Sequence, residues 1–170
     1  ERFLDNSSYA IQLCKNAVIK MAEYSKTAIL LAMEVQAEYA GEKVAEVIRL
    51  EQLVDQFEDV IGTYLVKLAG KDLSREDSHL LSVLLHCISD IERISDHAIN
   101  ITEAVDKIQK QGLEFTSQGK QELDSLGIAI RDIMTMTLNA LSTGNTTAAA
   151  DVEPLEEVID DLVMEMKQRH

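Results

Sequence analysis

The sequence predicts an all-α protein, an antiparallel helical bundle, from its composition, its few helix breakers and the spacing of its apolar residues. Hydrophobic residues make up 46 % of the 170 residues and aromatic residues only 4 %, with one proline and no tryptophan. A chain rich in Leu, Ile, Ala and Glu with so few breakers favours helices. The apolar residues recur at alternating intervals of three and four, which is the spacing of a helix face that packs against other helices.

The first three predicted helices have the longest apolar patterns. By their first and last apolar positions, they are Ala10–Val35, Val47–Leu68 and Leu80–Ile108. Gly41 separates the first helix from the second, and Gly70 closes the second. Ser74 and Asp77 resemble a capping box at the start of the third helix. Because the connections are short, we expect neighbouring helices to pack antiparallel.

Two more helices are predicted after Gly112, which ends the third. Their apolar positions run from Leu123 to Leu141 and from Leu155 to Met166. Residues 142–147 (STGNTT) separate these two helices, since small polar residues and glycine favour turns. Pro154 either lies in the first turn of the fifth helix or kinks it.

An internal repeat divides the chain into two parts. A shift of 105 residues aligns the segment that holds Leu50 and Val54 with the segment that holds Leu155 and Ile159. We therefore interpret residues 1–112 as a three-helix unit and residues 113–170 as the first two helices of a second unit, with the sixth helix missing. The apolar face of the last two helices then lacks a partner, which predicts dimerisation or domain swapping.

The balance of charge argues against one class of partner. The chain has 16 Lys and Arg against 30 Asp and Glu, a formal net charge of −14. Nothing in such a chain replaces the counterions of nucleic-acid phosphates, so we expect no nucleic-acid partner. The apolar runs are shorter than the roughly 20 residues of a membrane helix, so we expect the domain itself to be soluble.

Three acidic pairs with a spacing of four residues are the candidate metal ligands. They are Glu51 with Asp55, Glu92 with Asp96, and Glu156 with Asp160. On a helix this spacing places both carboxylates on one face, where they can share a cation such as iron, zinc, manganese or magnesium. The chain holds twelve such acidic pairs, so a solvated acidic face is an alternative interpretation. All three pairs lie beside the apolar faces, which predicts a site on the bundle surface between adjacent helices.

Other chemistry has less support in the sequence. Glu76 and His79 form one Glu-x-x-His motif, whereas a buried di-iron site needs two such motifs and two further glutamates. The sequence has no glycine-rich phosphate loop, nucleophile motif or Cys-x-x-Cys, so we expect neither an enzyme nor an organic cofactor. Cys14 and Cys87 fall on apolar helix faces and are interpreted as free core residues in a reducing compartment.

Residues 90–103 (DIERISDHAINITE) closely resemble the signature of PhoU, the bacterial phosphate-signalling regulator, and of PhoU-like domains. The segments LEQLVDQFEDVI and LEEVIDDL are similar to the partner motif of that family and its second copy. The resemblance implies tandem three-helix units and, as in some members, multinuclear iron or zinc clusters, or otherwise divalent cations. The metal ligands that it implies are Glu51, Asp55, Glu92, Asp96, Glu156 and Asp160, with Asn100 in support. The second unit departs from this pattern, since Val163 stands where the first unit has Glu58, Pro154 precedes Glu156, and the sixth helix with its motif is missing. The second site is therefore half a site unless another chain completes it.

The opening segment (ERFLDNSSYAIQLCKNAVIKMAEYS) resembles the segment that follows the membrane part of bacterial sodium/phosphate cotransporters. This resemblance implies a non-enzymatic regulatory domain on the cytoplasmic side of the cell membrane, which binds metal and tunes phosphate uptake. Its partners would be the membrane domain of the same chain and a second copy. The alternatives are a free-standing PhoU-type adaptor that acts on a phosphate ABC transporter and a sensor kinase, a carboxylate metalloenzyme, and a structural bundle with solvating acids.

Overall fold

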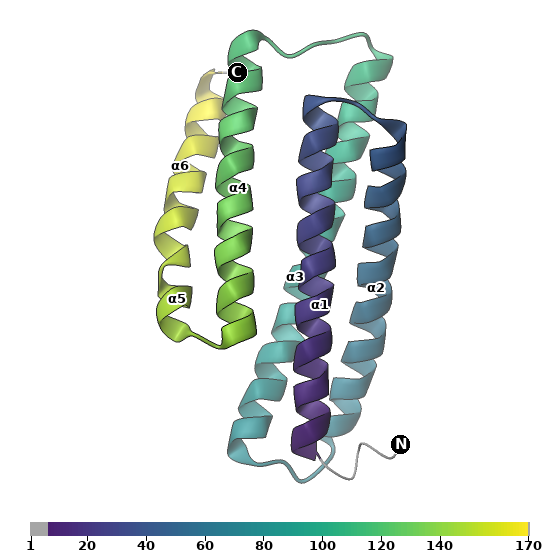
Figure 1. Ribbon diagram of the computed structural model, residues 1–170, viewed down its shortest axis with the longest axis vertical. Helices are drawn as coiled ribbons and strands as arrows, with labels where there is room; N and C mark the ends of the chain where they lie inside the picture. Colours follow the sequence, from purple (N-terminus) through teal and green to yellow (C-terminus); the bar gives the residue numbers. More distant parts are fainter. Residues whose placement is uncertain (1–6, 170) are drawn as a thin grey trace.

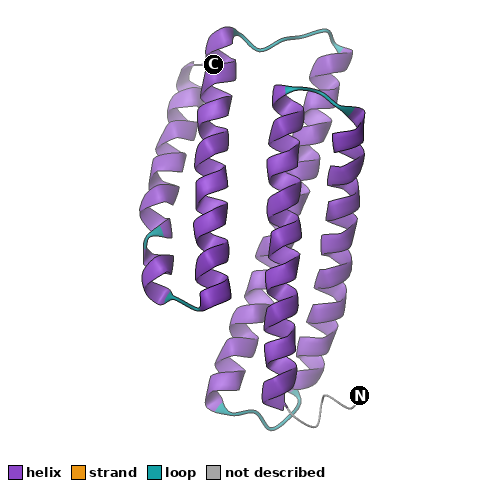
Figure 2. Ribbon diagram, in the orientation of Figure 1, coloured by secondary structure: helices purple, strands orange, loops and turns teal. Residues whose placement is uncertain are grey.

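The computed structural model describes residues 7–169, which form six helices and no strand (Figures 1 and 2). The helices are α1 (Ser7–Ala37), α2 (Gly41–Ala69), α3 (Arg75–Lys110), α4 (Ser117–Thr143), α5 (Thr146–Ala150) and α6 (Val152–Arg169). This confirms the predicted all-α class and the antiparallel bundle. None of the described helices combines the length and the apolar character needed to cross a membrane.

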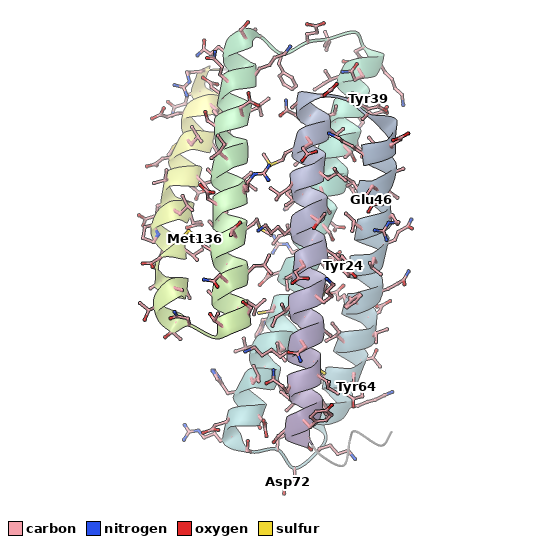
Figure 3. All side chains as sticks on the ribbon, in the orientation of Figure 1. Tyr24, Tyr39, Glu46, Tyr64, Asp72 and Met136 are labelled. Carbon is pink, nitrogen blue, oxygen red and sulfur yellow. The ribbon has the colours of Figure 1, made fainter. Side chains whose placement is uncertain are left out.

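The helices form a three-helix bundle with a helical hairpin against one side. The long helices α1, α2 and α3 each contact the other two, and α3 lies behind α1 in Figure 1. On its other side, α1 contacts α4, which in turn contacts α5 and α6. The side chain of Met136, a residue of α4, lies on the side of α4 that faces α6 (Figure 3). Within the described residues, the backbone of α6 comes close only to α4 and α5, so α4 provides the main contact between the hairpin and the bundle.

Helix α1 is buried on more faces than its predicted apolar face. Counted in alternating steps of four and three from Ala10 to Val35, the predicted face includes Leu31 and omits Ile11, Val18 and Ile29. In the structure these three residues are buried and Leu31 is only half-buried. The prediction assumed a single packed face, and it was wrong here because α2, α3 and α4 all contact α1. Helix α1 is therefore the central helix of the molecule.

Helix α3 is rotated slightly from the predicted packing. Ser95 and Thr102 are buried, while the predicted core positions Cys87 and Ile94 are only half-buried. The buried hydroxyls are satisfied locally, because Ser95 Oγ donates to the Glu92 carbonyl at 2.8 Å and Thr102 Oγ1 bonds its own helix backbone. A prediction that assigns only apolar residues to the core misses such buried hydroxyl groups. The rotation also decides which acidic side chains lie at the boundary between α2 and α3.

Both cysteines are free, as predicted. Cys14 is buried and Cys87 is half-buried. Both pack in the core cluster formed by the halves of the three long helices that are lower in Figure 1. Burial raises the pKa of both thiols, and the Asp90 carboxylate adds to the rise at Cys87. These thiols are therefore packing residues rather than reactive ones.

One pair of helix starts is separated by the repeat interval of 105 residues. Helix α2 begins at Gly41, and α5 begins at Thr146, which is one interval later. The fifth predicted helix corresponds to α6, which begins at Val152. The short helix α5 was not predicted, and a break after Ala150 separates it from α6. Pro154 lies in the first turn of α6, where its missing N–H would otherwise donate to the Ala150 carbonyl. The first of the two placements considered for the proline is thus confirmed, and the proline explains the break.

The predicted cap of α3 is present. The Asp77 backbone N–H donates to Ser74 Oγ at 3.0 Å. The Asp77 carboxylate does not complete the capping box but accepts a hydrogen bond from Ser8 Oγ at 2.6 Å, which ties α3 to the start of α1. Helix α2 ends at its C-cap Gly70 as predicted, and α3 ends at Lys110, just before the left-handed Gly112 that was predicted to end it.

Changing Ser74 to Ala is expected to lower the free energy of unfolding by about 1 kcal/mol, because an orphan backbone N–H of α3 loses its acceptor. Urea unfolding followed by circular dichroism measures the change. Ser78→Ala, one turn later on the same helix, is the control, since Ser78 is exposed and caps nothing. Equal effects of the two changes would contradict the cap.

Candidate metal centre

The boundary between α2 and α3 gathers five carboxylates, which we call the α2–α3 carboxylate cluster. Its members are Glu51, Asp55 and Glu58 on α2 and Glu92 and Asp96 on α3. The spacings of four and three on α2 and of four on α3 keep each set on one helix face. Because α2 and α3 run antiparallel, the two sets meet along the boundary. This brings together the two acidic pairs that the sequence predicted as the first site.

The two helices approach closely just beyond the cluster. A Cβ at Gly62 would lie 3.3 Å from Ile88 Cδ1, which is tighter than ordinary van der Waals contact. Next to this contact, Ser89 Oγ donates a hydrogen bond to Glu58 Oε1 at 3.0 Å. Gly62 therefore permits the close approach of the two helices, and the Ser89–Glu58 bond links them at one end of the cluster.

The acidic surroundings of Glu92 make it hard to ionise. Partial burial, the Asp96 carboxylate and the more distant Glu58 and Asp55 raise the pKa of Glu92 from 4.5 to about 7. The same carboxyl shares a hydrogen bond with Asp96, in which the protonated Glu92 is the donor. Below about pH 7, Glu92 therefore keeps its proton and adds no further negative charge to the cluster.

The pKa of Glu51, on α2, is raised by partial burial and by carboxylates of the same cluster. These carboxylates are Asp55 and Asp96. Since Asp55 lies on α2 and Asp96 on α3, the repulsion acts both within one helix and between the two. Among residues 7–169, no Lys or Arg forms an ion pair with a member of the cluster. The negative charge of the cluster is therefore not neutralised by the protein.

The cluster should make stability depend on pH. The folded state holds the Glu92 proton up to about pH 7 and the unfolded chain only up to about pH 4.5, so stability falls as pH rises through this window. Without added metal, Glu92→Gln is expected to raise the free energy of unfolding at pH 8 by less than about 1 kcal/mol, because solvent screens a half-exposed group. At pH 4.5 the gain should shrink.

Urea unfolding at the two pH values measures this difference. Glu103→Gln is the matched control, since Glu103 is exposed on the same helix and is paired with Lys107 instead of the cluster. A gain at pH 8 that equals the gain at pH 4.5, or that also appears in Glu103→Gln, would contradict the assignment.

The donor set of the cluster suits a cation. All five side chains offer carboxylate oxygens, and Ser89 adds a hydroxyl, which are ligands for hard and borderline cations. An excess of negative charge without a basic partner is the electrostatic complement of a multivalent ion. As the side chains stand, however, no three His, Cys, Asp or Glu residues between 7 and 169 converge on one position for an ion. The residue types suit such an ion, and their side chains have to rotate before three of them can bind it together.

The third predicted pair lies elsewhere. Glu156 and Asp160 are exposed on α6, which contacts only α4 and α5 among the described helices, so they do not join the cluster. Asn100, one turn beyond Asp96, is also exposed. Glu76 and His79 are exposed in the first turns of α3, about 20 Å along the helix from Glu92. Glu76 and His79 are therefore separate from the carboxylate cluster.

Two residues of the site were not among the predicted metal ligands, although Glu58 was noted as the acidic residue that Val163 replaces in the second unit. Glu58 faces Glu92, and Ser89 holds Glu58 in place. The signal for Glu58 was present, because it lies seven residues after Glu51 and therefore on the same helix face. The search for pairs four residues apart passed over it. Ser89 lies three residues before Glu92 on the matching face of α3, but a single serine carries no signal of its own.

Comparison with known proteins gives one match. The protein-family model described as "PhoU domain" matches residues 18–105, which is just over half of the 170-residue chain. The matched range runs from within α1 to near the end of α3 and includes the whole carboxylate cluster. No curated protein and no solved structure matches the chain significantly.

Proposed function

This chain belongs to the PhoU domain family, whose role is phosphate-related regulation, and from that membership we propose that it is the regulatory domain of a sodium-dependent phosphate cotransporter. The resemblance of its opening residues to the segment that follows the membrane part of such transporters supports the proposal. The first six of these residues lie outside the described range. The domain would act from the cytoplasmic side on the membrane domain of the same chain.

The observation that carries the regulatory part is the α2–α3 carboxylate cluster. Two helices bring five carboxylates together with no basic partner among the described residues, and this costs stability unless a cation is bound. Proteins keep such arrangements at functional sites more often than elsewhere. We take iron or zinc, or otherwise another divalent cation, as the ligand. Glu51 and Asp55 from α2 and Glu92 and Asp96 from α3 would hold it.

The cluster offers a simple physical route to regulation. A bound cation supplies positive charge. With that charge present, Glu92 gives up its proton and the carboxylates of α2 and α3 no longer repel one another. The two helices then keep one relative position, which α1 shares because it packs on both. The membrane domain would respond to the relative position of these three helices, so that cation occupancy changes phosphate uptake.

Fractionation of source cells tests the link to a transporter. An antibody raised against the domain is expected to detect a band in the membrane fraction at a mass well above 18.9 kDa. A soluble band only somewhat larger than this chain would contradict the proposal. It would favour the free-standing adaptor, for which the next search is for a kinase and an ABC transporter that bind it.

A further inference from the structure

Two open cavities lie along the boundary between α1 and α4, which run side by side in opposite directions (Figure 1). One cavity, of about 430 Å³, has Lys26 of α1 and Thr135 and Asn139 of α4 in its wall. The other, of about 250 Å³, has Arg131 of α4 and Leu30 of α1 in its wall. We call this boundary the α1–α4 groove. Each cavity is shared by the three-helix unit and the hairpin.

The two cavities are related by the repeat interval of 105 residues. Ile19, Glu23 and Lys26 in the wall of the larger cavity correspond to Asp124, Ile128 and Arg131 in the wall of the smaller one. In return, Leu30, Met33, Glu34 and Ala37 of the smaller cavity correspond to Thr135, Leu138, Asn139 and Ser142 of the larger one. Since α1 and α4 are antiparallel, this exchange is that of an internal twofold axis across the groove. Lys26 and Arg131 therefore occupy equivalent places on its two sides.

The geometry brings these two basic residues to one turn of α4. The Lys26 ammonium reaches across the groove and donates a hydrogen bond to Thr135 Oγ1 at 2.7 Å. Thr135 lies one helical turn after Arg131, and its hydroxyl donates to the Arg131 carbonyl at 2.7 Å. The ammonium of α1 is thus placed at the turn of α4 that carries the guanidinium.

Neither cation is neutralised by the part of the chain that the structure describes. No ion pair among the described residues includes Lys26 or Arg131. Glu23 and Glu34, which are acidic residues of the cavity walls, are each paired with another lysine, at 2.7 Å and 3.0 Å. Asp124, the remaining acidic residue of the walls, lies two helical turns from Arg131. Although the chain has a net charge of −14, this place is locally positive.

The available donors are of the kind that bind a phosphate group. Lys26 has three N–H donors and uses one of them on Thr135, and Arg131 has five in a fork that fits an oxyanion. The Asn139 backbone carbonyl accepts two hydrogen bonds, and its side-chain amide forms none among the described residues. The amide therefore adds a donor to the cavity that Lys26 lines.

The accessibility of the groove follows from the repeat. The α1 residues that correspond to Arg131 and Asn139 are Lys26 and Glu34, and both lie outside the core of the three-helix unit. Helices that pack on α4 as α2 and α3 pack on α1 would therefore leave Arg131 and Asn139 at the surface. The site does not depend on an uncovered hairpin.

We propose that the α1–α4 groove binds a phosphate group, with Lys26 from α1 and Arg131 from α4 as its main ligands. The bound anion bridges the two helices and strengthens the contact between the hairpin and the three-helix unit. Inorganic phosphate is the free form of this ligand, and it is also what the proposed transporter carries. The groove then couples the level of phosphate to the conformation of the domain. This coupling rests on the proposed function, whereas the binding itself does not.

Titration of the 170-residue chain with sodium phosphate, followed by the amide signals in nuclear magnetic resonance spectra, tests the binding. A chelator removes cations, so that phosphate cannot bind through a metal at the α2–α3 carboxylate cluster. We expect phosphate, but not sodium chloride at equal ionic strength, to shift the signals around Lys26 and Arg131. Lys26→Met and Arg131→Met should each weaken binding about tenfold, because each removes a charged donor. The two changes together should abolish it.

The matched control is Arg93→Met with Lys107→Met. This variant also loses one arginine and one lysine, from exposed positions on α3 away from the groove. It should bind phosphate as the unchanged chain does. Circular dichroism checks that all variants keep their helices.

Glycerol 3-phosphate, a phosphate monoester, is titrated in parallel to identify the source of the phosphate group. Inorganic phosphate that binds at least as tightly as the ester supports free phosphate as the ligand. An ester that binds much more tightly would support the site but overturn its link to transported phosphate.

Two results would overturn the site itself. The first is that phosphate shifts the signals of the unchanged chain no more than chloride does, a result that does not depend on any variant folding. The second is that the Arg93/Lys107 variant loses as much binding as the Lys26/Arg131 variant. A membrane-fraction band in cells together with no phosphate binding would remove this inference and leave the transporter proposal in place.

Discussion

Changing Glu92 to Gln and Asp96 to Asn together is expected to abolish the stabilisation of this domain by cations. In the unchanged chain, a divalent cation at a hundred times its dissociation constant should raise the free energy of unfolding by about 2.7 kcal/mol. The double change removes both carboxylates that α3 contributes and leaves α2 with too few ligands. Thermal unfolding with zinc, iron(II), manganese or magnesium added in turn measures the effect.

The matched control is the double change of Glu156 to Gln and Asp160 to Asn. These residues form a pair of the same kind and spacing, but they are exposed on α6 and away from the cluster. The control should keep the full cation response. Metal analysis of the purified proteins provides a second readout, and metal retained by the Glu92/Asp96 variant would remove these residues from the site.

Leu84→Ala is expected to have the largest effect on stability, a loss of about 2–5 kcal/mol. The Leu84 side chain is only 1 % exposed and packs in the cluster shared by α1, α2 and α3. Leu162→Ala on α6 removes the same atoms from a half-buried position, so its cost should stay at about 1 kcal/mol. Urea unfolding measures both, and equal losses would show that the hairpin is as tightly packed as the three-helix unit.

Much of the fold could be predicted because its signals are local. Ser74 begins α3 through its side-chain hydroxyl, and glycines follow the ends of α2 and α3 at Gly70 and Gly112. The break after Ala150 follows from Pro154 in the same way. The faces of α1 could not be read from spacing, because its burial depends on three neighbouring helices that only the tertiary structure defines.

The site was predictable in part for the same reason. Spacing identified Glu51 with Asp55 and Glu92 with Asp96 as acidic pairs on helix faces. That these pairs face each other depends on the rotation of α3, in which Ser95 rather than Ile94 is buried. The roles of Glu58 and Ser89 arise only between helices. Whether Glu156 and Asp160 belong to a second site stays a prediction, as does the division of the chain at residue 112.

The most direct test of the central claim is phosphate uptake by cells that express the parent protein with a changed cluster. If the cluster regulates uptake, Glu92→Gln with Asp96→Asn should change the sodium-dependent uptake rate and remove its response to the cation. Glu156→Gln with Asp160→Asn should leave both unchanged, at equal protein levels in the membrane. Uptake that is the same in all three proteins, with the cation response intact, would contradict a regulatory role of the α2–α3 carboxylate cluster.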